Sequence, residues 1–300
     1  MKILLFGKSG QVGWELQRAL APLGEVIALS SDSENYCGDF LKPDGIAKTI
    51  QQIQPDVIVN AAAYTAVDKA ESEQKQAQQI NADTVLILAQ EAKKIGAWLV
   101  HYSTDYVFDG QRSKPWEEED KTSPLNIYGA SKLAGEKFIK ENCPQHLIFR
   151  TSWVYAARGN NFAKTMLRLA KERPELGVIN DQIGAPTSAE LIADCTAHAI
   201  RTVVSAQSDR TIAGIYHLAA SGETSWHDYA AYVFAFAAKQ GVELKLKTLK
   251  AITTAGYVTP AQRPLNSRLN TQKITRVFDL TLPSWQQGVT RMLTEIMEQN

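Results

Sequence analysis

The sequence predicts an α/β protein with a Rossmann-type, doubly wound parallel sheet and a smaller C-terminal substrate-binding domain. Short apolar runs alternate with longer segments of helical periodicity in the first half of the chain, and this order indicates parallel strands with helices on both faces. Gly7, Gly10 and Gly13 directly follow the first apolar run and open the first helical segment. Glycines at such a turn let the backbone approach a pyrophosphate at the helix N-terminus. The fold class and this turn together indicate dinucleotide binding.

The elements of the first half follow in order. Ile3–Phe6 is continuously apolar, as expected for a strand buried on both faces. Gly96 is placed to end a long helix rich in Ala, Gln and Leu. Gly110–Asn126 is polar and contains two prolines, so we expect a loop that faces the substrate. The expected strands are Ile3–Phe6, Val26–Leu29, Val57–Val59, Trp98–Tyr102 and Leu147–Phe149, and the expected helices are Gln11–Leu20, Gly45–Ile53, Ala77–Ile95 and a helix containing Tyr128.

After about residue 150 the alternation is less regular. We expect helices at Ala189–Val204, Ser225–Lys239 and Ser284–Glu298, and strands at Ile215–Leu218 and Glu243–Leu249. The predicted dinucleotide-binding domain spans residues 1–150, with residues 175–220 returning to it. Residues 151–174 and 221–300 then form the substrate-binding domain.

The composition excludes several classes of protein. The 300 residues hold 32 Lys and Arg against 32 Asp and Glu, which gives no general affinity for nucleic acid or anionic membranes. Three widely spaced cysteines favour neither a disulfide framework nor a metal cluster. No apolar stretch approaches the roughly 18 to 20 residues of a membrane span. We expect a cytoplasmic protein with no membrane or nucleic-acid partner.

Tyr128 and Lys132 form a Tyr-x-x-x-Lys pair that one helix face would present to the same cleft. Chance alone produces about one such pair in a chain of this size, so its weight comes from its position after Ser103-Thr104-Asp105 at the end of a strand. A tyrosine ordinarily has a pKa of about 10, and a nearby ammonium favours the phenolate. Lowering that pKa by ~2 to 3 units requires about 3 to 4 kcal/mol. The pattern therefore predicts a proton-transfer site, whereas the simpler alternative is an aromatic helix start with an exposed lysine.

The choice of cofactor is less determined. Ser30, Ser31 and Asp32 follow the second expected strand, with no arginine. The two hydroxyls suit the 2′-phosphate of NADP and Asp32 suits the ribose of NAD, so we predict NADPH and keep NADH open. Ala61, Ala62 and Ala63 would let a flat adenine or ribose lie close to the backbone, although helix–sheet packing explains them better when they are taken alone.

Several longer motifs resemble the extended short-chain dehydrogenase/reductases, and within them the dTDP-4-dehydrorhamnose reductases. The resemblance covers nearly the whole chain. The matching segments are residues 7–13, 60–68 and 103–108, Tyr128-Gly129-x-x-Lys132-x-x-Gly135-Glu136, Arg150-Thr151-Ser152-Trp153-Val154-Tyr155, Asp181-Gln182-x-Gly184-x-Pro186-Thr187 and Arg263-Pro264-x-x-Ser267-x-Leu269.

The resemblance implies reduction of the C4 keto group of dTDP-4-dehydro-L-rhamnose with NAD(P)H, which supplies an activated sugar for cell-surface polysaccharide of the O-antigen type. It implies that Tyr128 donates the proton, that Lys132 binds the nicotinamide ribose, and that Thr104 hydrogen-bonds the carbonyl. The implied cofactor-binding residues are Gly7, Gly10, Gln11, Val12, Gly13, Ser30, Asp39, Phe40, Ala61, Ala62, Ala63, Tyr128 and Lys132. The implied substrate-binding residues are Val67, Thr104, Asp105, Tyr106, Trp153 and Arg263, the last as a candidate for the diphosphate.

Related 4,6-dehydratases carry Asp-Glu after the threonine, whereas Tyr106 follows Asp105 here, so reduction is favoured over dehydration. The family also implies a magnesium-dependent homodimer. Glu15, Glu190 and Asp194 are the candidate ligands, and solvated surface charges are the simpler alternative. Another nucleotide-sugar reductase or epimerase, and a non-catalytic NADP-binding regulatory subunit, stay open as alternative functions.

Overall fold

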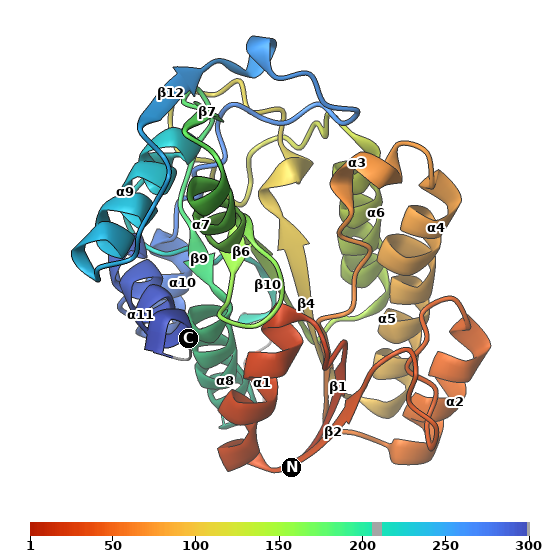
Figure 1. Cartoon of the computed structure of the whole chain (residues 1–300). Helices are drawn as coiled ribbons and strands as arrows, with labels where there is room; N and C mark the ends of the chain where they lie inside the picture. The colour runs from red at the N-terminus through yellow and green to blue at the C-terminus, as the bar shows by residue number, and fades with distance from the viewer. Residues whose placement is uncertain (206–211, 299–300) are drawn as a thin grey trace.

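The computed structural model describes residues 1–205 and 212–298. Residues 206–211, within the expected 175–220 segment, and residues 299–300 lie outside the described residues. A six-stranded parallel sheet has the order β10-β5-β4-β3-β1-β2 (Figure 1). Its strands are β1 (Lys2–Phe6), β2 (Glu25–Leu29), β3 (Val57–Asn60), β4 (Trp98–Thr104), β5 (His146–Thr151) and β10 (Gly214–His217). The predicted fold class is confirmed.

Helices cover both faces of this sheet because its central strands are apolar on both sides. Ile3 and Leu5 face one core cluster, which also contains residues of α1 (Gln11–Leu20), α8 (Ala189–Ser205) and α10 (Gln272–Phe278). Leu4 and Phe6 face the other cluster, which contains residues of α2 (Pro43–Ile53), α5 (Thr84–Ile95) and α6 (Ile127–Asn142). Adjacent residues of a strand point to opposite faces, so a continuous apolar run fills both layers.

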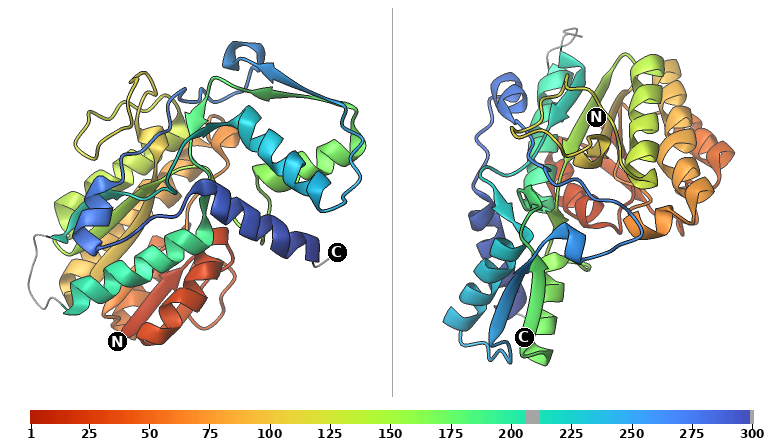
Figure 2. Two further views of the ribbon diagram at one scale, coloured as in Figure 1. Left: turned by 90° about the vertical axis from the view of Figure 1, so that its left-hand side faces the viewer. Right: turned by 90° about the horizontal axis from the view of Figure 1, so that it is seen from above.

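A smaller layer lies beside the main sheet (Figure 2). It consists of β7 (Glu175–Ile179), which pairs in parallel with β12 (Thr248–Ile252), and of α7 (Phe162–Glu172), α9 (Trp226–Lys239) and α11 (Trp285–Glu298). These elements enclose a third apolar cluster. Two short pairs, β6 (Val154–Tyr155) with β9 (Thr187–Ser188) and β8 (Ile183–Gly184) with β11 (Thr224–Ser225), connect the regions. The domain boundaries expected from the sequence stay a prediction.

Two expected elements need correction. The single helix Ala77–Ile95 is interrupted, because α4 (Gln74–Gln78) continues into the π-helical turn Gln79–Asp83 before α5 begins. Within that turn, the side chain of Asn81 bonds the backbone N and O of Tyr64 at 2.9 and 3.0 Å. The expected strand Glu243–Leu249 is also wrong, since strand pairing begins only at Thr248, opposite Glu175.

The sequence pattern did not predict α7, β7 and α10, where the alternation is weakest. The helix α3 (Val67–Ala70) was missed as well. None of the helices in the described parts of the chain is both long and apolar enough to cross a membrane.

Residues 110–126 form a loop, as expected, whereas its facing the substrate stays a prediction, and its contacts hold it in place. Its residue Trp116 forms an isolated bridge with Leu269. The Trp116 N–H donates to the carbonyl of Arg268 at 2.8 Å, and the Asn270 N–H donates to the carbonyl of Trp116 at 2.7 Å. The loop is therefore attached to the C-terminal segment 262–270.

Candidate active site

A cavity of about 490 Å³ opens at the carboxyl ends of β1, β3, β4 and β5, where parallel sheets bind ligands. Twelve of the residues predicted for the site line it. They are Gly10, Gln11, Val12, Ala61, Ala63, Val67, Thr104, Asp105, Tyr106, Tyr128, Lys132 and Trp153. The lining also includes residues for which the sequence predicted no role in the site, namely Thr65, Tyr102, Ser103, Thr151, Ser152, Val154 and Trp226.

The glycine turn forms one end of this cavity. Gly7 has φ +85°, and a Cβ there would lie 2.6 Å from the carbonyl carbon of Ala61. A Cβ on Gly13 would lie 2.0 Å from the oxygen of Gly7, so Gly7 and Gly13 pack the turn while Gly10 faces the cavity. No side chain caps the N-terminus of α1. The free N–H groups and the small lining residues fit a dinucleotide pyrophosphate.

The start of α6 brings Tyr128 and Lys132 into the cavity. The Asn126 side chain accepts the N–H of Gly129 at 2.8 Å and thereby caps the helix. A Cβ on Gly129 would lie 2.2 Å from the oxygen of Tyr106, so the helix packs directly against the turn that follows β4. Glycine at this position therefore sets how closely Tyr128 approaches the end of β4.

The Tyr128 hydroxyl interacts with the Thr104 side chain. The Tyr128 ring meets the Tyr106 ring edge-on, with centroids 5.8 Å apart. Burial raises the pKa of Tyr128 to about 12, the interaction with Thr104 lowers it in part, and the charge of Asp105 raises it. Desolvation of the phenolate dominates the pKa of Tyr128 in the protein alone, and the expectation that Lys132 lowers this pKa with the cofactor bound stays a prediction.

Lys132 instead faces a buried histidine. Its Nζ lies 3.2 Å from Nε2 of His101, whose Nδ1 lies 3.0 Å from Nδ2 of Asn60. Burial lowers the pKa of Lys132 to about 8, and the charge of Glu136 raises it in part. Burial and then the Lys132 charge hold the pKa of His101 well below its ordinary value. His101 was missed, although a histidine within an otherwise apolar strand was a usable signal.

Asp105 is buried at the end of β4. Thr104 donates to its Oδ1 at 3.2 Å, and its Oδ2 has no hydrogen-bond partner among the described residues. Burial raises the pKa of Asp105 to about 7, while the neighbouring Ser267 and Thr104 side chains lower it in part. A buried acceptor without a partner beside the cavity suits a hydroxyl of a bound sugar.

Two stacked indoles form the other end of the cavity. Trp153 and Trp226 have ring centroids 3.6 Å apart and an interplanar angle of 14°. Trp153 adopts φ +50°, and Trp226 Nε1 donates to Oε1 of Gln182 at 3.1 Å. Stacked aromatic faces suit the apolar side of a sugar ring. Trp226 was missed because its approach to Trp153 depends on how α9 packs.

The other predicted residues lie outside the cavity lining. Phe40 is buried in the core against Phe6, with ring centroids 5.5 Å apart, so only its backbone is available to a ligand. Ser30 donates to Oδ1 of Asp32 at 2.5 Å, and Asp39 accepts the N–H of Leu41 at 3.0 Å. Gly7, Gly13, Ala62, Ser30, Asp39, Phe40 and Arg263 are the predicted ligand-binding residues that do not line it.

Arg263 connects the C-terminal segment to α3. Its Nη2 lies 2.8 Å from Oδ2 of Asp68, and its side chain also interacts with Tyr106. Burial raises the pKa of Asp68, but the hydrogen bonds from Arg263 and from the Ala261 N–H, together with the charge of Arg263, hold it below its ordinary value. Arg263 thus lies beside the lining residues Tyr106 and Val67, with part of its charge compensated.

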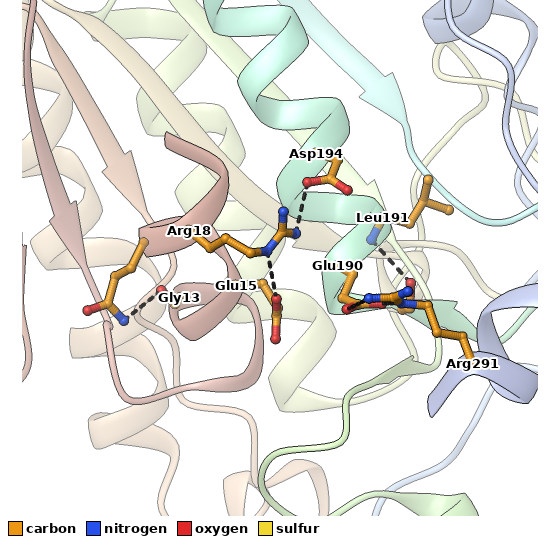
Figure 3. Close-up of polar contacts among 9 residues, drawn as sticks. Gly13, Glu15, Arg18, Glu190, Leu191, Asp194 and Arg291 are labelled. Carbon is orange, nitrogen blue, oxygen red and sulfur yellow. Dashed lines mark hydrogen bonds and ion pairs between the residues drawn. The ribbon is translucent and has the colours of Figure 1, made fainter. Parts of the chain in front are cut away.

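The three predicted metal ligands are paired with arginines (Figure 3). Arg18 contacts Glu15 at 3.5 Å and Asp194 at 2.9 Å, and Arg291 contacts Glu190 at 2.9 Å. In the parts of the chain that the structure describes, no group of three or more His, Cys, Asp or Glu side chains is arranged to hold a metal ion. One chain by itself therefore does not fit magnesium here.

The comparisons with known proteins agree with this geometry. The family model described as RmlD substrate binding domain matches residues 1–298. A dTDP-4-dehydrorhamnose reductase from Salmonella typhimurium (strain LT2) is 64% identical over 296 residues, which are 99% of this chain and 98% of that protein. The chain belongs to the dTDP-4-dehydrorhamnose reductase family.

Solved structures of this family have the same fold. The dTDP-4-dehydrorhamnose reductase from Clostridium acetobutylicum has a TM-score of 0.87 at 34% identity, with 99% of this chain and 100% of that chain covered. The Bacillus anthracis reductase, solved in complex with NADP, has a TM-score of 0.85 at 35% identity, with 98% and 99% covered. The family resemblance expected from the motifs is therefore confirmed.

Proposed function

We propose that this protein reduces the C4 keto group of dTDP-4-dehydro-L-rhamnose with NADPH and forms dTDP-L-rhamnose for cell-surface polysaccharide. The observation that carries the proposal is one cavity with three parts: the glycine turn at one end, the Tyr128–Thr104 pair in the middle, and the Trp153–Trp226 stack at the other end. The 64% identical relative from Salmonella typhimurium bears the name of this activity.

In this proposal, Tyr128 and Thr104 act on the same carbonyl oxygen. The raised pKa keeps Tyr128 protonated near neutral pH, so its hydroxyl can give a proton to the oxygen as negative charge develops there. Thr104 orients that hydroxyl and hydrogen-bonds the carbonyl. When bound, the nicotinamide supplies the hydride. Lys132 would bind its ribose.

Specificity for the sugar nucleotide would come from the residues around this pair. Trp153 and Trp226 would pack against the sugar ring, and Asp105 would accept one of its hydroxyls. Val67 and Tyr106 complete that part of the cavity wall. We assign Arg263 to the diphosphate, because it lies beside Tyr106 at the edge of this wall.

The lining also favours reduction over elimination of water. A dehydratase needs a second carboxylic acid next to Asp105, and Tyr106 occupies that position. Burial raises the pKa of Tyr106, which keeps its hydroxyl protonated and therefore unavailable as a base. A second function, such as epimerisation or cofactor binding without turnover, has no comparable support.

We propose NADPH as the preferred cofactor and NADH as an alternative. The Bacillus anthracis relative was solved with NADP. The hydrogen bond from Ser30 keeps the pKa of the exposed Asp32 low, so a carboxylate stands near the end of β2, and Lys8 offsets part of its charge. This balance suits an enzyme that accepts both cofactors.

The test is to mix the purified protein with dTDP-4-dehydro-L-rhamnose and either NADPH or NADH, and to follow the cofactor absorbance. We expect oxidation of NADPH and the formation of dTDP-L-rhamnose. The absence of oxidation with both cofactors would exclude the proposal. Tight NADPH binding without turnover on any sugar nucleotide would favour the regulatory alternative.

We also propose a homodimer, with magnesium placed between two chains rather than within one. Glu15 supports this, because burial and then the charge of Glu190 raise its pKa, although Arg18 lowers it in part. Sedimentation with EDTA and with added Mg²⁺ tests it, and a monomer under both conditions would contradict it. A cytoplasmic location stays a prediction from the sequence.

A further inference from the structure

Asn60, His101 and Lys132 form a buried chain of polar groups beneath the cavity. Asn60 and His101 are register partners on the adjacent strands β3 and β4, and each is 1% exposed. Lys132 is 2% exposed and reaches His101 from α6. Contacts of 3.0 and 3.2 Å join the three side chains, so each proton position depends on the next.

A backbone N–H fixes the direction of hydrogen-bond donation through these three polar side chains. The Ala62 N–H donates to Oδ1 of Asn60 at 3.1 Å, so the amide oxygen faces Ala62 and the amide nitrogen faces His101. That nitrogen carries only donors, so Nδ1 of His101 must accept. A neutral imidazole that accepts at Nδ1 carries its proton at Nε2. The Asn60 amide thereby selects the tautomer of His101.

This tautomer presents a donor to Lys132. An ammonium also has donors only, so a charged Lys132 would face the Nε2–H across 3.2 Å without a hydrogen bond. The neutral amine of Lys132 can accept that proton. A doubly protonated imidazole does not remove the conflict, because its Nδ1–H would face the Asn60 amide hydrogens.

The other charged groups around Lys132 do not reverse this preference. Glu136 lies one turn further along α6, but Arg150 of β5 binds both of its oxygens, at 2.9 and 2.7 Å. On the β4 side, burial favours the neutral form of His101. Asp105 also lies there, but burial and the charge of Glu136 are what shift the pKa of Lys132. On its own helix, burial also keeps Tyr128 neutral.

We propose that His101 favours the neutral amine of Lys132 in the cofactor-free protein, so that cofactor binding takes up one proton at Lys132 Nζ. The proton comes from solvent and bonds to the amine lone pair. The Nε2–H bond of His101 stays intact while Lys132 turns toward the ribose hydroxyls, which can accept. The statement that cofactor binding takes up a proton rests on the proposed role of Lys132 at the ribose. His101 and Asn60 are then positioning residues.

The tautomer is tested first, on the protein without ligand. Nitrogen-15 NMR of protein labelled at histidine distinguishes a bare Nδ1 from a protonated one, and a His101→Gln variant assigns the signal. We expect a bare Nδ1 and a protonated Nε2 for His101. His146 and His217 are internal references of the opposite tautomer, because each places Nδ1 against a backbone carbonyl, at 2.6 and 3.0 Å. A protonated Nδ1 on His101 would overturn the proposal.

The variant Asn60→Asp should reverse the direction of the hydrogen bonds that join residue 60, His101 and Lys132. A carboxylate accepts from both the Ala62 N–H and His101 Nδ1, so the proton of His101 should move to Nδ1 and Nε2 should accept from a charged Lys132. The same NMR experiment reads this switch. An unchanged His101 tautomer in a folded Asn60→Asp protein would contradict the assigned role of Asn60.

Proton uptake is measured by calorimetric titration with NADH at about pH 8.5, in buffers of different ionisation heat. This pH lies above the pKa of about 8 that burial gives Lys132. NADH is used because it lacks the 2′-phosphate, which itself titrates near pH ~6. We expect wild type to take up most of one proton per site and Asn60→Asp to take up close to none. Equal uptake in both would overturn the inference, whereas failure of NADH and NADPH to bind would count against the proposed function.

Discussion

Burial sets the protonation states at the reacting end of the cavity, because desolvation penalises every charged form. It raises the pKa of Tyr128 to about 12 and that of Asp105 to about 7, and it lowers the pKa of Lys132 to about 8. These protonation states suit a reductase, since the phenol of Tyr128 stays protonated until negative charge develops on the carbonyl oxygen. If Lys132 gains its charge when the cofactor binds, the phenol becomes more acidic only in the complex.

The change Tyr128→Phe removes the proton donor and keeps the ring. We expect turnover to fall by about 10²- to 10⁴-fold, the usual contribution of a positioned general acid. The Kd for NADPH, measured by fluorescence titration, should stay within about twofold, because the ring still packs edge-on against Tyr106. Tyr232→Phe, on α9 and outside the cavity, is the matched control. Turnover like wild type in Tyr128→Phe would remove this residue from the mechanism.

The change Asp105→Asn tests the raised carboxyl pKa through stability. The folded-state pKa of about 7 lies above the ordinary value of 3.8, so the folded protein binds more protons than the unfolded chain between these values. Stability from this group is therefore present at low pH and lost as the pH rises toward 7. Asparagine cannot ionise, so the variant should gain stability over wild type between pH 5 and pH 8. Each pKa unit corresponds to about 1.4 kcal/mol, so urea unfolding should show that the difference in unfolding free energy between variant and wild type changes by more than ~1 kcal/mol over this pH range. A difference that does not change with pH would refute the raised pKa of Asp105.

At the scale of elements, close backbone approaches position the functional side chains. The start of α6 lies against the turn after β4 at Gly129, and β8 lies against the indole of Trp153 at Gly184. A Cβ on Gly184 would be 2.7 Å from Cε2 of that indole. Trp153 has φ +50°, so the backbone at this position holds a conformation that side chains rarely adopt. Packing from β8 and Trp226 keeps its indole in place.

The change Gly184→Ala should displace the Trp153 indole. We expect the KM for the sugar nucleotide to rise by about tenfold or more, while the Kd for NADPH stays unchanged, because the glycine turn lies at the other end of the cavity. Steady-state kinetics and fluorescence titration measure the two quantities. Gly177→Ala on β7 is the control, since its Cβ would meet Ile252 only at an ordinary 3.4 Å. Equal effects on both ligands would argue against a local role in sugar binding.

A buried ion pair joins β5 to α6. Arg150 and Glu136 are almost fully buried, and Arg150 also stacks over Phe108 at 5.1 Å. Arg150→Met leaves the carboxylate of Glu136 buried and unpaired, so we expect a loss of about 3 to 5 kcal/mol in unfolding free energy. The double variant Arg150→Met/Glu136→Leu should recover much of that loss. Chemical denaturation measures both, and additive losses would contradict the pairing argument.

At the scale of the whole molecule, the cavity lies where the main sheet meets segments that return from the C-terminal half. Arg263 pairs with Asp68, and the Asn126 side chain donates to the carbonyl of Gln262 at 2.7 Å. The bridge between Trp116 and Leu269 connects the 110–126 loop to the same segment. These contacts place the C-terminal segment over the substrate side of the cavity, so ordering of that segment and formation of the site are linked.

The change Arg263→Met tests the assignment of the diphosphate. We expect the KM for the sugar nucleotide to rise by about tenfold and the KM for NADPH to stay unchanged, because Arg263 borders the cavity beside Tyr106 and away from the glycine turn. Arg276→Met, on an exposed position of α10, is the control. The increase should shrink at high salt, where charge interactions are screened. A lower kcat with unchanged KM values would instead indicate a role in the chemical step.

The sequence by itself determined the Rossmann half, the glycine turn and the Tyr128–Lys132 pair. Each of these rests on a local signal: the continuous apolar strands, the glycine spacing after β1, and the helical spacing of the pair. Such signals survive in sequence because neighbouring residues produce them. The second half gave weaker signals, and there the strand Glu243–Leu249 was misplaced and α7 was missed.

Only the tertiary structure decided which distant groups meet. The stacking of Trp226 on Trp153 depends on the packing of α9, and the contact of His101 with Lys132 depends on strand register and on where α6 starts. Local sequence patterns likewise did not predict that arginines would pair with Glu15 and Glu190. Burial, which sets every pKa in the cavity, is a property of the folded chain as a whole. The sequence therefore identified the proton donor, and the structure decided which groups control its acidity.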